Sequence, residues 1–335
     1  MSEEIILSRK ALIMIGIISA VIVIIGIIMI ALGYNEAFYL NYTLIQALFK
    51  AITYLGEAIV LIIIIAIFYI IYDKKFAKNL AFGLLISAYI MEFMKETFQD
   101  PRPSTNIDSE AEYGFIEPSY GFPSGHTQNS VVVWGYIGYE FKDKPTSFVI
   151  PIILSFLIFL IAISRMIIGV HDLQDVIGGF AIGMCLLIAF IYLEPIIAPI
   201  INKLNLIIRI LLSVVISISL FAIGTLLFPA AALGLVDNPP LYSDAGSFAL
   251  VGGSMLGLSV GYLLENEYVN YNPSELNKKQ KIINLIIGII IILVAYLSLD
   301  LIISGNVILR FVRYATISFI LTFFVPIIFK NINRS

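Results

Sequence analysis

The chain has 335 residues, of which 60% are hydrophobic and 13% are charged, and its formal net charge is -3. Soluble domains carry about 25% charged residues, and a globule of this length could not bury so much apolar surface, so the composition excludes an ordinary soluble protein. The 20 Lys and Arg residues are spread along the chain, which argues against a nucleic-acid partner. The single cysteine, Cys185, excludes an internal disulfide.

Apolar runs close to the roughly 20 residues that cross a bilayer recur along the chain. We therefore expect an all-α, polytopic membrane helix bundle. The first run is longer than the roughly 7–15 apolar residues of a signal-peptide core, so we interpret it as an uncleaved anchor helix. The ten expected spans are about 11–32, 51–72, 79–95, 125–141, 147–168, 172–193, 206–227, 243–265, 282–303 and 307–329.

The orientation of the spans follows from the positive charges in the short loops, because such loops tend to stay in the cytoplasm. With ten spans, most basic residues fall on one side, which places both termini in the cytoplasm of a multi-pass cell-membrane protein. These residues are Arg9, Lys10, Lys74, Lys75, Lys78, Lys142, Lys144, Lys203, Lys278, Lys279, Lys281, Lys330 and Arg334. The opposite side keeps Lys50, Lys95, Arg102, Arg165, Arg310 and Arg313.

The chain is expected to have two blocks. Residues 1–194 form the first, Pro195 and Pro199 flank a short linker, and residues 195–335 form a C-terminal extension of four spans. The polar segment 266–281 is the longest cytoplasmic connection.

Glycines at every fourth position of two expected spans allow close helix contact. They are Gly253, Gly257 and Gly261 in the eighth span and Gly179 and Gly183 in the sixth. We expect the eighth-span surface to pack within one chain, while a homo-oligomer stays open. Between the last two spans we expect a structural ion pair of Asp300 with Arg310, with Arg313 as the second candidate.

Two histidines, His126 and His171, occur in the chain, and both lie at span ends on the expected outer side. Consecutive spans run in opposite directions, so the ends of the third and fifth spans share one membrane face with the starts of the fourth and sixth. This topology gathers Lys95, Arg102, Ser124, His126, Arg165, His171 and Asp175 on that face. Cations concentrated there are costly unless they meet an anion.

Phosphate is the anion that these side chains fit. Arginine offers a planar fork that matches phosphoryl oxygens, and lysine adds a compact charge. The backbone amides around Ser124, Gly125 and His126, at a helix start, can point N–H groups at the same oxygens, and Gly125 permits a close approach of the backbone.

A histidine nucleophile is suggested by the spacing of His171 and Asp175, which are four residues apart and therefore on one helix face. The carboxylate can hold one ring nitrogen and leave the lone pair of the other free to attack phosphorus. The second histidine, His126, is then available to protonate the departing oxygen.

Three segments, Lys95-x6-Arg102-Pro103, Pro123-Ser124-Gly125-His126 and Ser164-Arg165-x5-His171-x3-Asp175, resemble the three-part signature of the type 2 phosphatidic acid phosphatase (PAP2) superfamily. The resemblance covers about residues 51–193. It implies a six-helix PAP2-like core, followed here by about four additional transmembrane helices.

The same resemblance implies the role of each site residue. His171 attacks phosphorus and forms a phosphohistidine, Asp175 orients it, and His126 acts as general acid and then activates water. The phosphoryl group is bound by Lys95, Arg102, Ser124, Gly125 and Arg165. No metal and no cofactor is implied.

Simpler structural roles stay open for single residues. Lys95 and Arg165 could be interfacial residues with their charged ends in water, Ser124 could be a helix cap, and Asp175 could pair with any nearby cation. An acidic loop, 100–117, could screen the site or select a head group, although a solvated loop is the simpler reading. Its acidic residues are Asp100, Asp108, Glu110, Glu112 and Glu117.

A phosphatase site that faces outward predicts a lipid phosphate substrate in the bilayer. We expect a polyprenyl diphosphate of the undecaprenyl or dolichyl type, because such carriers are discharged on the outer leaflet. A sphingoid phosphate or a phosphatidate-type monophosphate is the alternative substrate. Two other functions stay open, a lipid phosphotransferase and a non-enzymatic lipid-phosphate transporter, and the few charges in spans seven to ten weaken the second.

Overall fold

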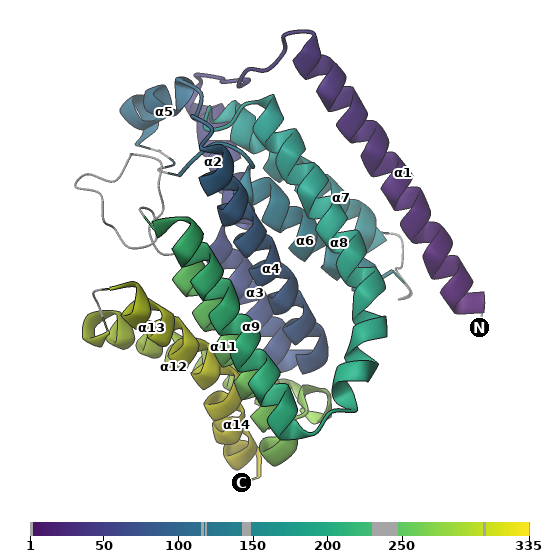
Figure 1. The fold of residues 1–335 in the computed structure, drawn as a ribbon, viewed down its shortest axis with the longest axis vertical. Coiled ribbons are helices and arrows are strands. Elements are labelled where there is room, and N and C mark those ends of the chain that lie inside the picture. The colour runs from purple at the N-terminus through teal and green to yellow at the C-terminus, as the bar shows by residue number, and fades with distance from the viewer. Residues whose placement is uncertain are drawn as a thin grey trace. The chain divides into compact units, whose positions relative to one another are not determined.

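The computed structural model describes residues 3–114, 117, 119–142, 149–229, 247–303 and 306–334, and the regular elements in these ranges are helices (Figure 1). The chain divides into two compact units. The first comprises Met1–Leu61 and Phe93–Ile196, and the second comprises Ile62–Glu92 and Ile197–Ser335. The domain boundary at residue 194 stays a prediction.

The first unit contains the predicted site residues, on its helices and on the segments that connect them. Its helical elements are α1 (Glu3–Ala31), α2 (Thr43–Thr53), the short turn η1 (Tyr54–Gly56), α5 (Thr105–Tyr113), α6 (Gly125–Glu140) and α7 (Val149–Ile167). Three further helices run from one unit into the other along the chain, namely α3 (Ala58–Ile71), α4 (Lys74–Phe98) and α8 (Leu173–Asn202).

Most of the second unit follows α8. It contains α9 (Leu206–Leu227), α11 (Ser247–Leu264), η2 (Glu265–Val269), η3 (Pro273–Glu275), α12 (Lys278–Ile302), α13 (Val307–Phe319), η4 (Ile320–Phe324) and α14 (Val325–Arg334). The predicted loop 266–281 is therefore shorter than expected, because η2 continues helical structure to Val269 and α12 begins at Lys278.

Eight helices of the described chain are long and apolar enough to cross a membrane, and nine if a bent pair counts as one span. The bent pair, Thr43–Gly56 and Ala58–Ile71, turns by 49° and takes the place of the predicted span 51–72. The predicted span 125–141 corresponds to α6, whose 16 residues extend about 24 Å, less than the ~30 Å hydrocarbon core. The prediction of ten full-length spans is thus corrected to eight long helices, one bent pair and the shorter α6, and the chain is a multi-pass integral membrane protein.

The linker predicted at Pro195 and Pro199 is wrong, because α8 continues through both prolines to Asn202. Proline removes a backbone donor and usually bends a helix in water. Apolar helices in membranes tolerate it when neighbouring groups satisfy the freed carbonyls. The connection to α9 is instead the short segment before Leu206.

Close packing of α11 against α13 and η4 confirms the role expected for the glycines of the eighth span. A Cβ at Gly253 would lie 2.2 Å from the carbonyl oxygen of Phe311, and one at Gly257 would lie 2.1 Å from that of Ala315. At Gly261 it would lie 2.0 Å from Thr322 Oγ1. The surface therefore packs within the chain.

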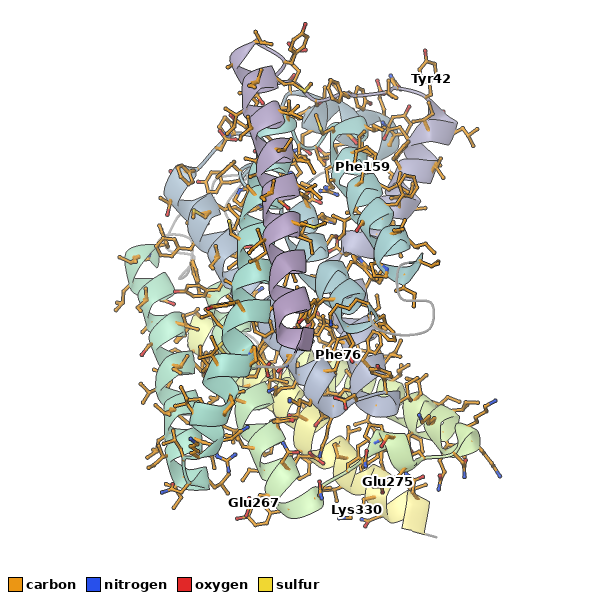
Figure 2. The ribbon with its side chains drawn as sticks, turned by 90° about the vertical axis from the view of Figure 1, so that its right-hand side faces the viewer. Tyr42, Phe76, Phe159, Glu267, Glu275 and Lys330 are labelled. Atoms are coloured by element: carbon orange, nitrogen blue, oxygen red, sulfur yellow. The ribbon has the colours of Figure 1, made fainter. Side chains whose placement is uncertain are left out.

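Charged side chains of the second unit form two ion pairs of note. Lys74 Nζ donates to Glu265 Oε2 at 2.7 Å. Three further charged residues, Glu267, Glu275 and Lys330, lie at one end of the same unit (Figure 2). Asp300 pairs with Arg313, which the sequence named as the second candidate after Arg310. The two arginines are three residues apart on one face of α13, so the sequence pattern could not separate them.

Candidate active site

The four helix ends that the topology assigns to one face meet inside the first unit. Arg102, after α4, donates through Nη1 to the carbonyl oxygen of Val170, in the turn between α7 and α8, at 2.7 Å. The amide of Ser124, which precedes α6, donates to the carbonyl oxygen of Asp175, in the first turn of α8, at 2.9 Å. Gly179 permits this contact, since a Cβ there would lie 2.6 Å from the carbonyl oxygen of Ser124.

His171 and Asp175 form the pair that the spacing predicts. His171 Nδ1 lies 2.7 Å from Asp175 Oδ2, and both side chains are buried. The backbone amide of His171 donates to the carbonyl oxygen of Arg165 at 3.2 Å, which ties the ring to the end of α7. On its other edge, His171 Nε2 lies 2.9 Å from Arg102 Nη1. A carboxylate on one nitrogen and a cation on the other hold the ring in one orientation.

Lys95 and Arg102 both hold the segment Ser119–Tyr120. Lys95 Nζ donates to Ser119 Oγ at 2.6 Å and to the Tyr120 carbonyl oxygen at 2.8 Å. Arg102 Nε donates to the Ser119 carbonyl oxygen at 2.6 Å. The two cations are buried and their charges act on His171, so the interpretation that Lys95 points its charged end into water is wrong.

Arg165 is fully buried and binds a carboxylate that the sequence left in a solvated loop. Its Nη2 donates to Glu117 Oε1 at 2.5 Å, and its Nη1 donates to Thr53 Oγ1 at 2.9 Å. Glu117 also approaches Arg102, whose Nη2 lies 4.0 Å from Oε2. Glu117 thus binds Arg165 and lies near Arg102, the two arginines that are expected to bind a phosphoryl group. The solvated-loop interpretation is wrong for this residue.

His126 lies in the first turn of α6 and has its own carboxylate partner. Its Nε2 lies 2.7 Å from Glu57 Oε2, at the break between η1 and α3. The charges of Arg165 and Glu117 both act on the His126 ring. The charge of His126 in turn acts on His171, so the two predicted histidines lie within electrostatic range of each other.

Ser124 uses both its amide and its hydroxyl in contacts at the start of α6. The Ser124 amide is used by the Asp175 carbonyl, and its hydroxyl lies 3.0 Å from Thr127 Oγ1. Ser124 stands at the N-cap position of α6, but its side chain caps no backbone amide. The amides of Gly125 and His126 open the helix, where no preceding turn supplies a carbonyl partner.

Electrostatics at the site favour a neutral His171 and an ionised Glu117. Burial and the nearby charges of Arg102, Arg165 and Lys95 lower the pKa of His171 well below its ordinary value. Burial alone would raise the pKa of Glu117, but the charges of Arg165, His126 and Arg102 outweigh it and lower this pKa to about 2. A neutral imidazole retains the lone pair that attack on phosphorus requires.

Sequence reasoning missed the carboxylate of Glu57 and named Glu117 only as one member of an acidic loop that could screen the site, although each carboxylate left a further signal. Glu57 is the one acidic residue between Asn41 and Tyr72, in an otherwise apolar segment, and ionisable residues in such segments usually serve a function. Three buried cations with a single predicted carboxylate, Asp175, also imply a further anion, because buried charges are paired.

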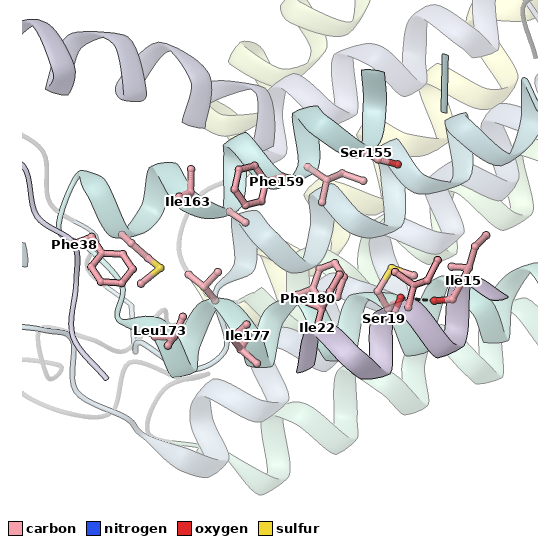
Figure 3. A pocket seen from close by; sticks show the side chains of 16 residues that line it. Ile15, Ser19, Ile22, Phe38, Ser155, Phe159, Ile163, Leu173, Ile177 and Phe180 are labelled. Carbon is pink, nitrogen blue, oxygen red and sulfur yellow. Dashed lines mark hydrogen bonds between the residues drawn. The ribbon is translucent and has the colours of Figure 1, made fainter. Parts of the chain in front are cut away.

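An apolar cavity of about 500 Å³ lies in the first unit between α1, α7 and α8 (Figure 3). Hydroxyls of Ser19 and Ser155 are the polar side-chain groups of its lining, and Ser19 donates to the Ile15 carbonyl oxygen at 2.7 Å. The lining contains no histidine or charged side chain, so the cavity supplies no groups for catalysis. In the described part of the chain, no three His, Cys, Asp or Glu side chains are grouped so that they could hold a metal ion.

Two family models match the chain. Residues 76–197 match the PAP2 superfamily, and residues 249–335 match the transmembrane extension of PAP2 superfamily phosphatases. The first match contains every predicted site residue, and the second falls in the C-terminal extension.

Three curated relatives are lipid phosphatases by name. A lipid A 4'-phosphatase of Porphyromonas gingivalis is 30% identical over 36% of this chain and 54% of its own length. Phosphatidylglycerophosphatase B of Bacillus subtilis is 40% identical over 21% of this chain and 37% of its own length. Lipid phosphate phosphatase delta of Arabidopsis thaliana is 26% identical over 34% of this chain and 30% of its own length. The chain thus spans about half or less of the length of each.

Proposed function

Because this chain belongs to the PAP2 superfamily, we propose that it is a membrane enzyme that hydrolyses a lipid phosphate through a phosphohistidine formed on His171. The observation that carries the proposal is the buried His171 ring, with Asp175 on Nδ1 and Arg102 on Nε2. A carboxylate on Nδ1 stabilises the tautomer whose lone pair is on Nε2, which is the nucleophilic atom. In the resting site this lone pair accepts a hydrogen bond from Arg102 Nη1, and Arg102 must turn to the phosphoryl oxygens before Nε2 attacks.

In the first step, His171 Nε2 attacks phosphorus, and the bond between phosphorus and the leaving oxygen breaks. His126 gives a proton to that oxygen. The leaving group is therefore an alcohol when the substrate is a monophosphate ester, and a lipid monophosphate when the substrate is a diphosphate. The phosphoryl group is now bonded to His171. Asp175 stabilises the positive charge that the ring carries during attack.

In the second step, His126 takes a proton from water, and the resulting hydroxide attacks phosphorus. The bond between phosphorus and His171 breaks, inorganic phosphate leaves, and both histidines return to their starting states. Fixed cations act on the charge of the phosphoryl group in both steps, and Lys95, Arg102 and Arg165 have this role.

Before the first step, the phosphoryl group must replace the carboxylate of Glu117. Arg165 gives Glu117 a hydrogen bond of 2.5 Å, and Arg102 lies 4.0 Å from the same side chain. A phosphoryl group offers more acceptor oxygens and more negative charge to the same arginines. The resting site therefore holds an internal anion in the position proposed for the substrate anion.

For the substrate we propose a polyprenyl diphosphate. The names of the three relatives have one feature in common, a phosphate-bearing lipid as substrate. This supports a lipid phosphate as the substrate class and does not select a lipid tail. The finer choice rests on the predicted outward-facing site, because polyprenyl carriers must lose a phosphate at the outer leaflet before reuse.

The proposed topology puts both termini in the cytoplasm and the site outside. A Cys185→Ser background removes the one native thiol. In intact cells, an impermeant maleimide should then label Glu110→Cys, near the site, and should leave Lys279→Cys unlabelled until the cells are opened. The reverse pattern would invert the topology.

Phosphate release tests the function. The purified full chain in lipid nanodiscs should release inorganic phosphate from a panel of polyprenyl diphosphates, phosphatidate and sphingoid phosphates, with a preference for the diphosphates. A chelator should leave the rate unchanged. A phosphorylated acceptor in place of free phosphate would make the enzyme a phosphotransferase, and lipid transport at the normal rate by His171→Ala would favour a transporter.

A further inference from the structure

The chain breaks its helix at one acidic residue. After α2, the turn η1 ends at Gly56, and α3 begins at Ala58, so Glu57 stands alone between them in an extended conformation with φ -69° and ψ 137°. The two helical segments differ in direction by 49°. An interruption in an apolar helix exposes backbone groups that lipid cannot satisfy, so it is retained where neighbouring protein packs against it.

Packing against α6 and α7 fixes this break. A Cβ at Gly56 would lie 2.8 Å from Ser130 Oγ, on α6, and 2.7 Å from Ile161 Cγ2, on α7, so only glycine permits the approach. One residue earlier, the Leu55 carbonyl oxygen accepts a hydrogen bond from Trp134 Nε1 at 3.1 Å. The break therefore has a defined position against α6, the helix that carries His126.

Glu57 reaches the histidine that the proposed mechanism uses twice. Its Oε2 lies 2.7 Å from His126 Nε2, and its side chain is 40% exposed while that of His126 is 13% exposed. Besides Glu57, the charges of Arg165, from α7, and of Glu117, from the loop before α6, act on His126. Glu117 is bound to Arg165, which leaves Glu57 as the carboxylate in contact with the His126 ring.

We infer that Glu57 is the positioning residue of His126: it accepts a hydrogen bond from Nε2–H and makes Nδ1 the nitrogen that gives and takes the proton. The inference rests on the proposed hydrolase function. The two imidazoles then have matching arrangements, His171 with Asp175 on Nδ1 and His126 with Glu57 on Nε2. In each, a carboxylate selects the tautomer and stabilises the charged ring during its step.

The tautomer of His126 tests the inference without any assay of activity. The chain has two histidines, so ¹⁵N-histidine labelling of the full chain gives two imidazole spectra, and His171→Asn identifies the one from His126. Neutral His126 should carry its proton on Nε2, and Glu57→Ala should produce a mixture of tautomers. A proton on Nδ1 of His126 in the native chain would overturn the inference.

Kinetics of Glu57→Gln test the same inference through the reaction. With a lipid alkyl phosphate, kcat should fall about 10–100-fold, the range for removal of a group that orients a reacting residue, and KM should hold. p-Nitrophenyl phosphate needs no proton on its leaving oxygen, so Glu57→Gln should release one equivalent of nitrophenolate at the native rate. It should then turn over slowly, because His126 must still activate water.

Glu36→Gln is the matched control, since it removes an exposed carboxylate from the same unit, and it should behave like the native chain on both substrates. Glu57→Asp, which keeps the charge, should restore part of the lost kcat. Equal losses in the nitrophenolate burst and in lipid hydrolysis would mean that Glu57 only supports the fold. If the native chain hydrolyses no lipid phosphate, the proposed function fails, and the tautomer still decides the role of Glu57.

Discussion

The carboxylate of Glu117 lies on the guanidinium of Arg165, with 2.5 Å between Oε1 and Nη2. The arginine is fully buried, and the carboxylate is the part of the pair that reaches solvent, with 20% of its side chain exposed. In the proposed mechanism, a substrate phosphoryl group that binds Arg165 therefore has to displace Glu117.

Removal of the Glu117 charge should strengthen anion binding. We expect Glu117→Gln to bind orthovanadate about tenfold more tightly, because loss of a charge-assisted contact worth ~1.4 kcal/mol is enough for that factor. The gain should be the same between pH 5 and pH 8, since the pKa of Glu117 is about 2. Inhibition curves of phosphate release at several pH values measure it.

Glu112→Gln is the control, because Glu112 contacts the exposed Tyr39 hydroxyl and neither arginine. Without anion, Glu117→Gln should lose about 1–3 kcal/mol of stability, the cost of leaving a buried charge without its partner. Vanadate should restore its Tm. Unchanged vanadate affinity would show that Glu117 does not compete for the arginines.

The pH dependence of the free energy of unfolding should reveal the lowered pKa of His171. Its pKa in the fold lies well below 6.5 because of burial and the charges of Arg102, Arg165 and Lys95, whereas an unfolded histidine titrates near 6.5. Between these two values the unfolded chain binds more protons, so stability rises with pH and is lost as pH falls below 6.5. The acidic limb of kcat/KM should likewise lie below pH 6.5.

Thermal unfolding between pH 8 and pH 5 measures this effect. His171→Asn removes the titrating group, so its Tm should fall less steeply with decreasing pH than that of the native chain. Equal slopes for the two proteins would show that His171 does not titrate at a lowered pKa in the fold.

Gly169 should be indispensable for the turn between Arg165 and His171. Its φ is +84°, and a Cβ would lie 2.6 Å from Tyr39 Cδ2 and 3.0 Å from Thr105 Cβ. Gly169→Ala should therefore reduce the free energy of unfolding by about 1–3 kcal/mol and lower kcat by moving His171. Tm and phosphate release measure the two effects.

A matched control separates backbone strain from steric overlap. Gly33 has φ +90° with no atom within 4 Å of the position of an added Cβ. Gly33→Ala therefore introduces backbone strain without steric overlap and should leave kcat unchanged. Equal effects of both substitutions on kcat would mean that the Gly169 contacts do not position His171.

Sequence patterns predicted well wherever one strong constraint dominates. Hydrophobic run length predicted the long helices, and alternation of spans brought the ends near Lys95, Ser124, Arg165 and His171 together. The i, i+4 spacing predicted the contact of His171 with Asp175. These features depend on local chain geometry or on the bilayer thickness, which a single sequence contains.

Other features depended on contacts that no local pattern encodes. The bent pair around Glu57 and the insertion of Glu117 are set by packing against α6 and by burial of Arg165. Continuation of α8 through Pro195 and Pro199 overrides the usual effect of proline, and the pairing of Asp300 with Arg313 depends on how two helices meet. Each required the position of a second element.

Covalent labelling of His171 is the most direct test of the proposed mechanism. The chain should be mixed with ³²P-labelled p-nitrophenyl phosphate and quenched in base, under which a phosphohistidine survives. His126→Ala should accumulate label on His171, because water is no longer activated, and His171→Asn should carry none and release no phosphate. Label or near-native phosphate release in His171→Asn would contradict the account.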